Sequence, residues 1–134
     1  MNTTIVEVLQ ANDAFYRAFV RGDAEALVAL LSGRDDLEVM HPGWPTVRGQ
    51  ALVTATWRDV TTNPPPLRVV APRVLALGAD AAIVTCYEHV ESTTLVATNV
   101  WVREADGWRL LHHQSAPSVR DADAAVAPPD DLFH

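Results

Sequence analysis

The sequence predicts an α+β domain in which helices come first and antiparallel strands follow. Within the first 60 residues, apolar side chains recur mainly every three or four positions, the period of helices with one buried face. After a proline-rich break at 63–66 the period becomes two, which is typical of strands. Because helices and strands are segregated rather than alternating, the order excludes a βαβ repeat. A length of 134 residues suits one domain.

The first helix is expected over residues 5–21. Thr4 and Glu7 have the spacing of a capping box, in which each side chain satisfies a free backbone N–H group. Gly22 follows the last apolar residue of the pattern and supplies a C-terminal stop.

Two more helices are expected, with one short strand between them. Asp23 can cap a second helix over 24–31. Alternation then predicts a strand over 37–41, so that His41 stands at a strand end. After a loop rich in proline, the apolar spacing over 49–60 indicates the third helix.

The second half of the chain is predicted to be a run of antiparallel strands. These are expected over 67–77, 81–91, 94–104 and 108–115. Pro72 interrupts the first of them and therefore marks a sheet edge or a bulge. The predicted domain covers 1–118, and residues 119–134, mostly Ala, Asp and Pro without a period, are expected to form a flexible acidic tail.

Composition excludes several classes of partner. With 17 acidic and 10 basic residues the net charge is −7, which repels the phosphates of nucleic acids. No apolar run approaches the roughly 18 residues that a membrane span needs. Since there is one cysteine and no leader-like segment, the expected location is the cytoplasm.

The histidines and glycines predict neither a metal nor a cofactor. His112 and His113 are adjacent on a strand, so their side chains leave on opposite faces and cannot share an ion. Cys86 stands alone in the middle of a strand, as small buried side chains do. No glycine-rich loop is present that could hold the phosphates of a nucleotide.

The last two strands carry the most informative pattern. Alternation places Asn99 and Trp101 on one face, and His112 and Gln114 on one face of the neighbouring strand. If these faces coincide, they form an apolar patch with polar tips, which is typical of small-molecule sites. The same pattern also fits ordinary core residues, and a register change of one residue would put His113 in place of His112.

Two motifs resemble the nuclear transport factor 2-like superfamily. They are V-M-H-P-G-W at 39–44 and N-V-W-V-R-E-A-D-G-W-R-L-L-H-H-Q-S at 99–115. Within the superfamily the chain is similar to the SnoaL-like branch, to ketosteroid isomerases and to the association domain of calcium/calmodulin-dependent kinase II. The resemblance implies a cystatin-like fold: a curved, cone-shaped antiparallel sheet wrapped on three N-terminal helices, with a pocket between the sheet and the first helix.

The resemblance also implies a homodimer through the outer face of the sheet. Thr98, Val100 and Val102 lie on the strand face opposite Asn99, and a partner would remove their apolar surface from water.

Ketosteroid isomerases use a carboxylate base and, as oxyanion donors, a tyrosine and a protonated acid. By resemblance, His41 stands at the position of the base, Asn99 at that of the acid, and Phe15 or Tyr16 at that of the tyrosine. A neutral imidazole with a pKa of about 6.5 can take up a proton at neutral pH. His41 and Asn99 are therefore the catalytic candidates.

These features favour a protein that binds a small apolar or mixed-polarity organic ligand and performs the proton transfer of an isomerase, cyclase or dehydratase. The alternative is a non-catalytic dimeric association module, and the residues leave open whether the protein is an enzyme. Asn12 interrupts the apolar stripe of the first helix, either as a pocket group or as a structural bridge. The candidate ligand-binding residues are Asn12, Tyr16, Trp44, Trp57, Trp101, His112 and Gln114.

Overall fold

The computed structural model describes residues 2–119 and confirms the α+β class. Residues 120–134, most of the predicted tail, lie outside the described part. The elements in chain order are α1 (Thr3–Arg21), α2 (Ala24–Val28), β1 (Glu38–Met40), β2 (Val47–Arg48), α3 (Gln50–Thr62), β3 (Leu67–Ala76), β4 (Ala81–Val90), β5 (Thr93–Glu104) and β6 (Gly107–Pro117).

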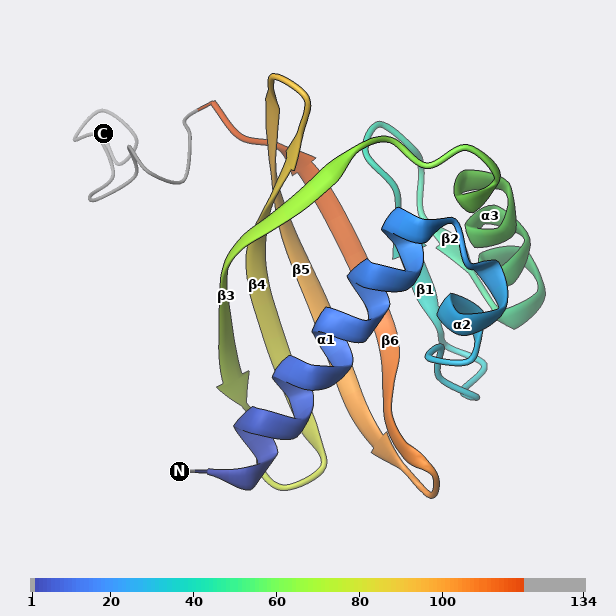
Figure 1. Cartoon of the computed structure of the whole chain (residues 1–134). Coiled ribbons are helices and arrows are strands. Elements are labelled where there is room, and N and C mark those ends of the chain that lie inside the picture. Colours follow the sequence, from blue (N-terminus) through green and yellow to red (C-terminus); the bar gives the residue numbers. More distant parts are fainter. Residues whose placement is uncertain (1, 120–134) are drawn as a thin grey trace, which may run out of the picture.

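Six strands form one open sheet in the order β2-β1-β6-β5-β4-β3. The helix α1 runs diagonally across one face of this sheet, and α2 and α3 lie beside its β1–β2 end (Figure 1). The pairs are antiparallel except β1 with β6, which are parallel. No helix in residues 2–119 is long and apolar enough to cross a membrane.

One end of α1 agrees with the prediction from the sequence, and the other does not. The predicted capping box is wrong: Asn2 is the N-cap, its side chain accepts from the Thr4 N–H group at 2.9 Å, and Thr4 lies inside the helix. At the other end Gly22 adopts φ +69°, as a C-terminal stop requires. A Cβ at Gly22 would also come within 2.9 Å of the Thr61 carbonyl, so glycine is needed there for space as well.

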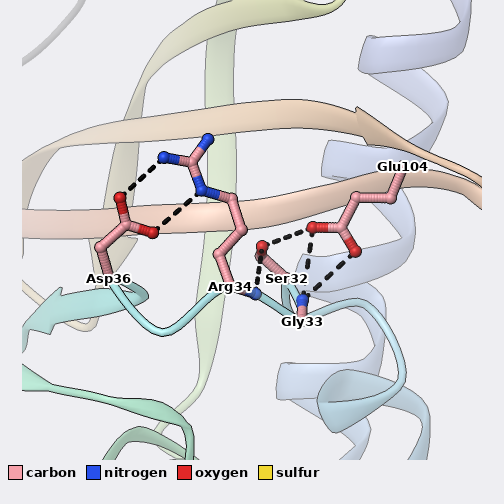
Figure 2. A network of polar contacts seen from close by, with 5 residues as sticks. All are labelled: Ser32, Gly33, Arg34, Asp36 and Glu104. Atoms are coloured by element: carbon pink, nitrogen blue, oxygen red, sulfur yellow. Dashed lines mark hydrogen bonds and ion pairs between the residues drawn. The ribbon is translucent and has the colours of Figure 1, made fainter.

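The helix α2 has the predicted cap, Asp23, but is shorter than predicted. Its last residues leave the helix because their backbone joins β6: Leu110 N–H donates to the Leu30 carbonyl at 2.7 Å, and Ser32 N–H donates to the Leu110 carbonyl at 2.9 Å. The Ser32 hydroxyl then donates to Glu104 at 2.5 Å, and the Gly33 N–H group donates to the same carboxylate (Figure 2). This link ties the α2–β1 connection to the end of β5.

Two bulges shape the sheet. In β3 the pairing shifts between Val70 and Arg73, and the strand lies at the sheet edge, so Pro72 marks both features that it predicted. The second bulge lies between β5 and β6, where Val100 pairs with His112 but Trp101 pairs with Leu110.

The β5–β6 bulge reverses part of the predicted strand faces. The extra residue on β6 is Leu111, so the alternation that points Leu110 inward continues on His113 and Ser115. The prediction that His112 and Gln114 share the inner face is therefore wrong. Both lie on the outer face of the sheet, and His113 takes the inner position.

Candidate functional site

A cavity of about 390 Å³ lies between α1, α3 and the inner face of the sheet. This volume falls within the roughly 300–1,000 Å³ of small-molecule sites. Its wall is mostly apolar and includes the aromatic rings of Phe15, Phe19 and Trp57. The titratable groups along that wall are Tyr16, His41, Glu88 and His113.

His41 follows β1 and is 5% exposed. Its Nε2 atom lies 3.0 Å from the Thr56 hydroxyl, which donates its own hydrogen to the Val53 carbonyl at 2.8 Å. Because a hydroxyl has a single hydrogen, His41 Nε2 must be the donor, and Nδ1 carries the free lone pair. Burial lowers the pKa of His41, which keeps the ring neutral. Its ring packs edge-on against Trp57, with 4.7 Å between the centroids.

A buried amide pair lies behind the cavity and is oriented by an indole. Trp101 Nε1–H donates to Asn12 at 3.2 Å, and an indole N–H group can only donate, so the atom it meets is the Asn12 oxygen. The Asn99 group that lies 2.9 Å from this oxygen must then be the amide nitrogen. Asn99 Oδ1 is consequently turned toward His113, at 2.5 Å from Nδ1.

His113 is held as one tautomer by this arrangement. Since Asn99 Oδ1 can only accept, His113 Nδ1 carries the hydrogen and Nε2 is left with its lone pair. Burial lowers the pKa of His113 to about 3, and the nearby His41 and His112 act in the same direction. His113 is therefore a neutral hydrogen-bond acceptor of the cavity wall.

Tyr16 and Glu88 continue the same network. Asn99 Nδ2 also donates to the Tyr16 hydroxyl at 3.1 Å, and Tyr16 donates its hydrogen to Glu88 Oε2 at 2.6 Å. Burial raises the pKa of both groups, although the Tyr16 and Ser115 hydroxyls lower that of Glu88. A buried carboxyl with a raised pKa holds its proton more readily and can give it to a bound molecule.

Four of the predicted site residues line the cavity: Tyr16, His41, Trp44 and Trp57. Asn12, Asn99 and Trp101 are buried behind the wall, where they orient the groups that face the cavity. His112 and Gln114 lie on the other side of the sheet and bond to each other at 2.8 Å, and His112 also contacts Glu38 at 3.0 Å.

Glu88 was missed in the sequence, although a signal was available. Val84, Cys86 and Glu88 alternate along β4 and share the inner face, so a carboxylate stands where apolar residues are expected. Burial raises the pKa of the Cys86 thiol to about 11, which keeps it protonated. Within residues 2–119, no group of three or more His, Cys, Asp or Glu side chains gathers to hold a metal ion.

The comparisons with known proteins agree with this architecture. The SnoaL-like domain family matches residues 8–119. A candidate dehydratase of the NTF2-like family from Streptomyces avermitilis is 31% identical, with a TM-score of 0.79 over 88% of this chain and 98% of that protein. A candidate calcium/calmodulin-dependent protein kinase type II association domain from Thiobacillus denitrificans is 30% identical, with a TM-score of 0.66 over 81% and 92%.

A third solved structure shares the fold at lower identity. It is a ketosteroid isomerase-like protein from Erwinia carotovora atroseptica, 20% identical, with a TM-score of 0.74 over 90% of this chain and all of that protein (100%). No curated protein matches the chain significantly. The family model matches most of this chain, and the crystal structure that is 31% identical covers 88% of it. The chain belongs to the SnoaL-like family of the nuclear transport factor 2-like fold.

Proposed function

We propose that this protein binds a small, largely apolar organic molecule in the cavity and catalyses a proton transfer on it. One observation carries the proposal: a neutral imidazole with a free lone pair, His41, and a buried carboxyl, Glu88, line the same apolar cavity. Acids and bases whose pKa values are shifted by an apolar site are typical of proton-transfer enzymes.

In the proposed reaction His41 is the base and Glu88 the acid. For a dehydration, His41 Nδ1 takes a proton from the carbon next to a hydroxylated carbon, and the electron pair of that C–H bond forms the double bond. The C–O bond breaks, and the leaving oxygen takes the proton of Glu88 and departs as water. His41 then returns its proton to Glu88 through solvent. Similarity to a candidate dehydratase makes this the first reaction to assay.

Asn99 has a positioning role in this scheme. It is 0% exposed, and its amide bonds to Asn12, Tyr16 and His113. We therefore assign it to the orientation of Tyr16 and His113, and not to direct contact with the reacting molecule.

The test is hydrogen–deuterium exchange on a bound molecule, because it detects proton transfer before the net reaction is known. Thermal shift against carboxylic acids, steroids, polyketide-like aromatics and terpenoid lactones selects a binder. Its acidic C–H positions are then followed by NMR in D₂O. His41→Ala is expected to abolish exchange and retain binding. His112→Gln removes an imidazole from the opposite face and is expected to leave exchange unchanged. Exchange that persists in His41→Ala would refute the assignment of the base.

A second function, association of this chain with its own copy, is supported by the outer face of the sheet. Register places Leu75, Ile83 and Val100 in one row on that face, and Leu75 is 60% exposed. Such apolar surface favours a partner. Val100→Asp is expected to convert a dimer into a monomer in light scattering after size-exclusion chromatography, whereas Val100→Thr is expected to leave it intact. A wild-type monomer at micromolar concentration would contradict this function.

A further inference from the structure

We infer that the molecule bound in the cavity is an uncharged hydroxyl compound that donates hydrogen bonds to the wall, and that carboxylates are excluded. The inference rests on the proposed function and names the chemical class of its ligand.

The two histidines of the cavity both act as acceptors. The N–H group of His41 donates to Thr56, and that of His113 donates to Asn99. A free lone pair therefore remains on His41 Nδ1 and on His113 Nε2. The Tyr16 hydroxyl likewise donates its hydrogen within the wall, to Glu88 Oε2 at an oxygen–oxygen distance of 2.6 Å. A ligand therefore meets two free acceptors on these histidines, beside the carboxyl of Glu88 that acts as the proposed acid. A buried acceptor without a donor costs free energy, so a hydroxyl group binds there better than a carbonyl group.

Trp101 makes the acceptor role of His113 hard to reverse. For His113 Nε2 to carry the hydrogen, Nδ1 would need a donor in Asn99, and the amide of Asn99 would have to turn over. Its oxygen would then face the oxygen of Asn12, which the indole of Trp101 holds in place. Each hydrogen bond from Trp101 through the two asparagines to His113 therefore has one allowed direction, because the indole N–H group can only donate. Trp101 is thus a positioning residue that sets the tautomer of His113 from a distance.

The charges around the cavity also disfavour a carboxylate ligand. All 10 basic residues of the chain are arginines, and in the described part of the chain none of them lines the cavity. Glu88 contributes a carboxyl to the wall, and both histidines are neutral because burial lowers their pKa. A bound carboxylate would lose its hydration in a cavity that offers it no cation, which disfavours it strongly.

The experiment compares three probes on one bicyclic skeleton: 2-naphthalenemethanol, 2-naphthaldehyde and 2-naphthoate, titrated by calorimetry at pH 7. The alcohol is expected to bind at least tenfold tighter than either of the others. Equal or tighter binding of the naphthoate would overturn the inference while leaving a ligand-binding cavity. If neither these probes nor any compound of the thermal-shift panel binds, the proposed function fails, and the inference fails with it.

The role of Trp101 has its own readout, the ¹⁵N spectrum of the histidine rings. The wild-type protein is expected to show His113 with hydrogen on Nδ1. In Trp101→Phe, which removes the indole N–H group, signals of the second tautomer are expected, and the preference for the alcohol over the aldehyde is expected to fall. Trp108→Phe is the matched control, because the buried Trp108 N–H group has no hydrogen-bond partner in the described part of the chain. An unchanged His113 spectrum in folded Trp101→Phe would refute the inference that Trp101 sets the tautomer of His113.

Discussion

Acid should destabilise this protein through His113. Its pKa is about 3 in the folded state, against an ordinary value of 6.5, because the ring is fully buried. As pH falls below 6.5, the unfolded chain binds a proton on this ring and the folded chain does not. The free energy of unfolding that His113 contributes is therefore present above pH 6.5 and is lost progressively as pH falls toward 3.

The size of this loss follows from the two pKa values. Each pH unit well inside the window changes the free energy of unfolding by about 1.4 kcal/mol. Between pH 6.5 and pH 4.5 the first half-unit contributes little, because the unfolded histidine is only half protonated at pH 6.5. The expected contribution of His113 over this interval is about 2 kcal/mol.

Urea denaturation at both pH values measures this contribution. His113→Gln keeps an N–H donor for Asn99 but cannot titrate, so its stability is expected to change with pH by about 2 kcal/mol less than that of the wild type. Val60→Ala removes apolar volume from the same cavity wall without touching the imidazole, and it is expected to keep the full wild-type pH dependence. Equal pH dependence in wild type and His113→Gln would refute the view that His113 is buried as a neutral ring.

Three further predictions concern stability. The stability of the wild type should fall as pH rises above 4.5, because the raised pKa of Glu88 favours its protonated form in the folded state. Glu88→Gln should remove this loss, which denaturation at pH 4 and pH 7 measures. Asn12→Ala leaves two buried N–H groups without their acceptor and should cost about 2–4 kcal/mol in the same assay at pH 7. Gly22→Ala should cost about 1–3 kcal/mol by thermal unfolding, because of its positive φ and the 2.9 Å approach to Thr61, whereas Gly43→Ala, with nothing within 4 Å, should cost less.

Local signals in the sequence predicted most of the fold. Gly22, Asp23 and Pro72 act through backbone conformation or a short-range hydrogen bond, so their effects can be read from a few neighbouring residues. The end of α2 could not be predicted in this way. Leu30 leaves the helix to bond with Leu110, a partner 80 positions later in the chain.

The candidate site was predicted only in part, and the reason is the β5–β6 bulge. A single extra residue, Leu111, exchanges the inner and outer faces for the rest of β6. No glycine or proline marks this position in the sequence, so His112 and Gln114 were assigned to the face that His113 and Ser115 occupy.

The sequence by itself determined the order of the elements, the mainly antiparallel sheet, the inward positions of Tyr16, His41 and Trp57, and the family. Periodicity and caps are properties of neighbouring residues, which the chain carries whether or not it is folded. The tertiary structure alone decided that Glu88 and His113 join His41 at one cavity, and in which direction each hydrogen bond runs. Those directions depend on a donor-only indole, Trp101, which meets Asn12 only when β5 packs against α1, and this contact spans 89 positions of the chain.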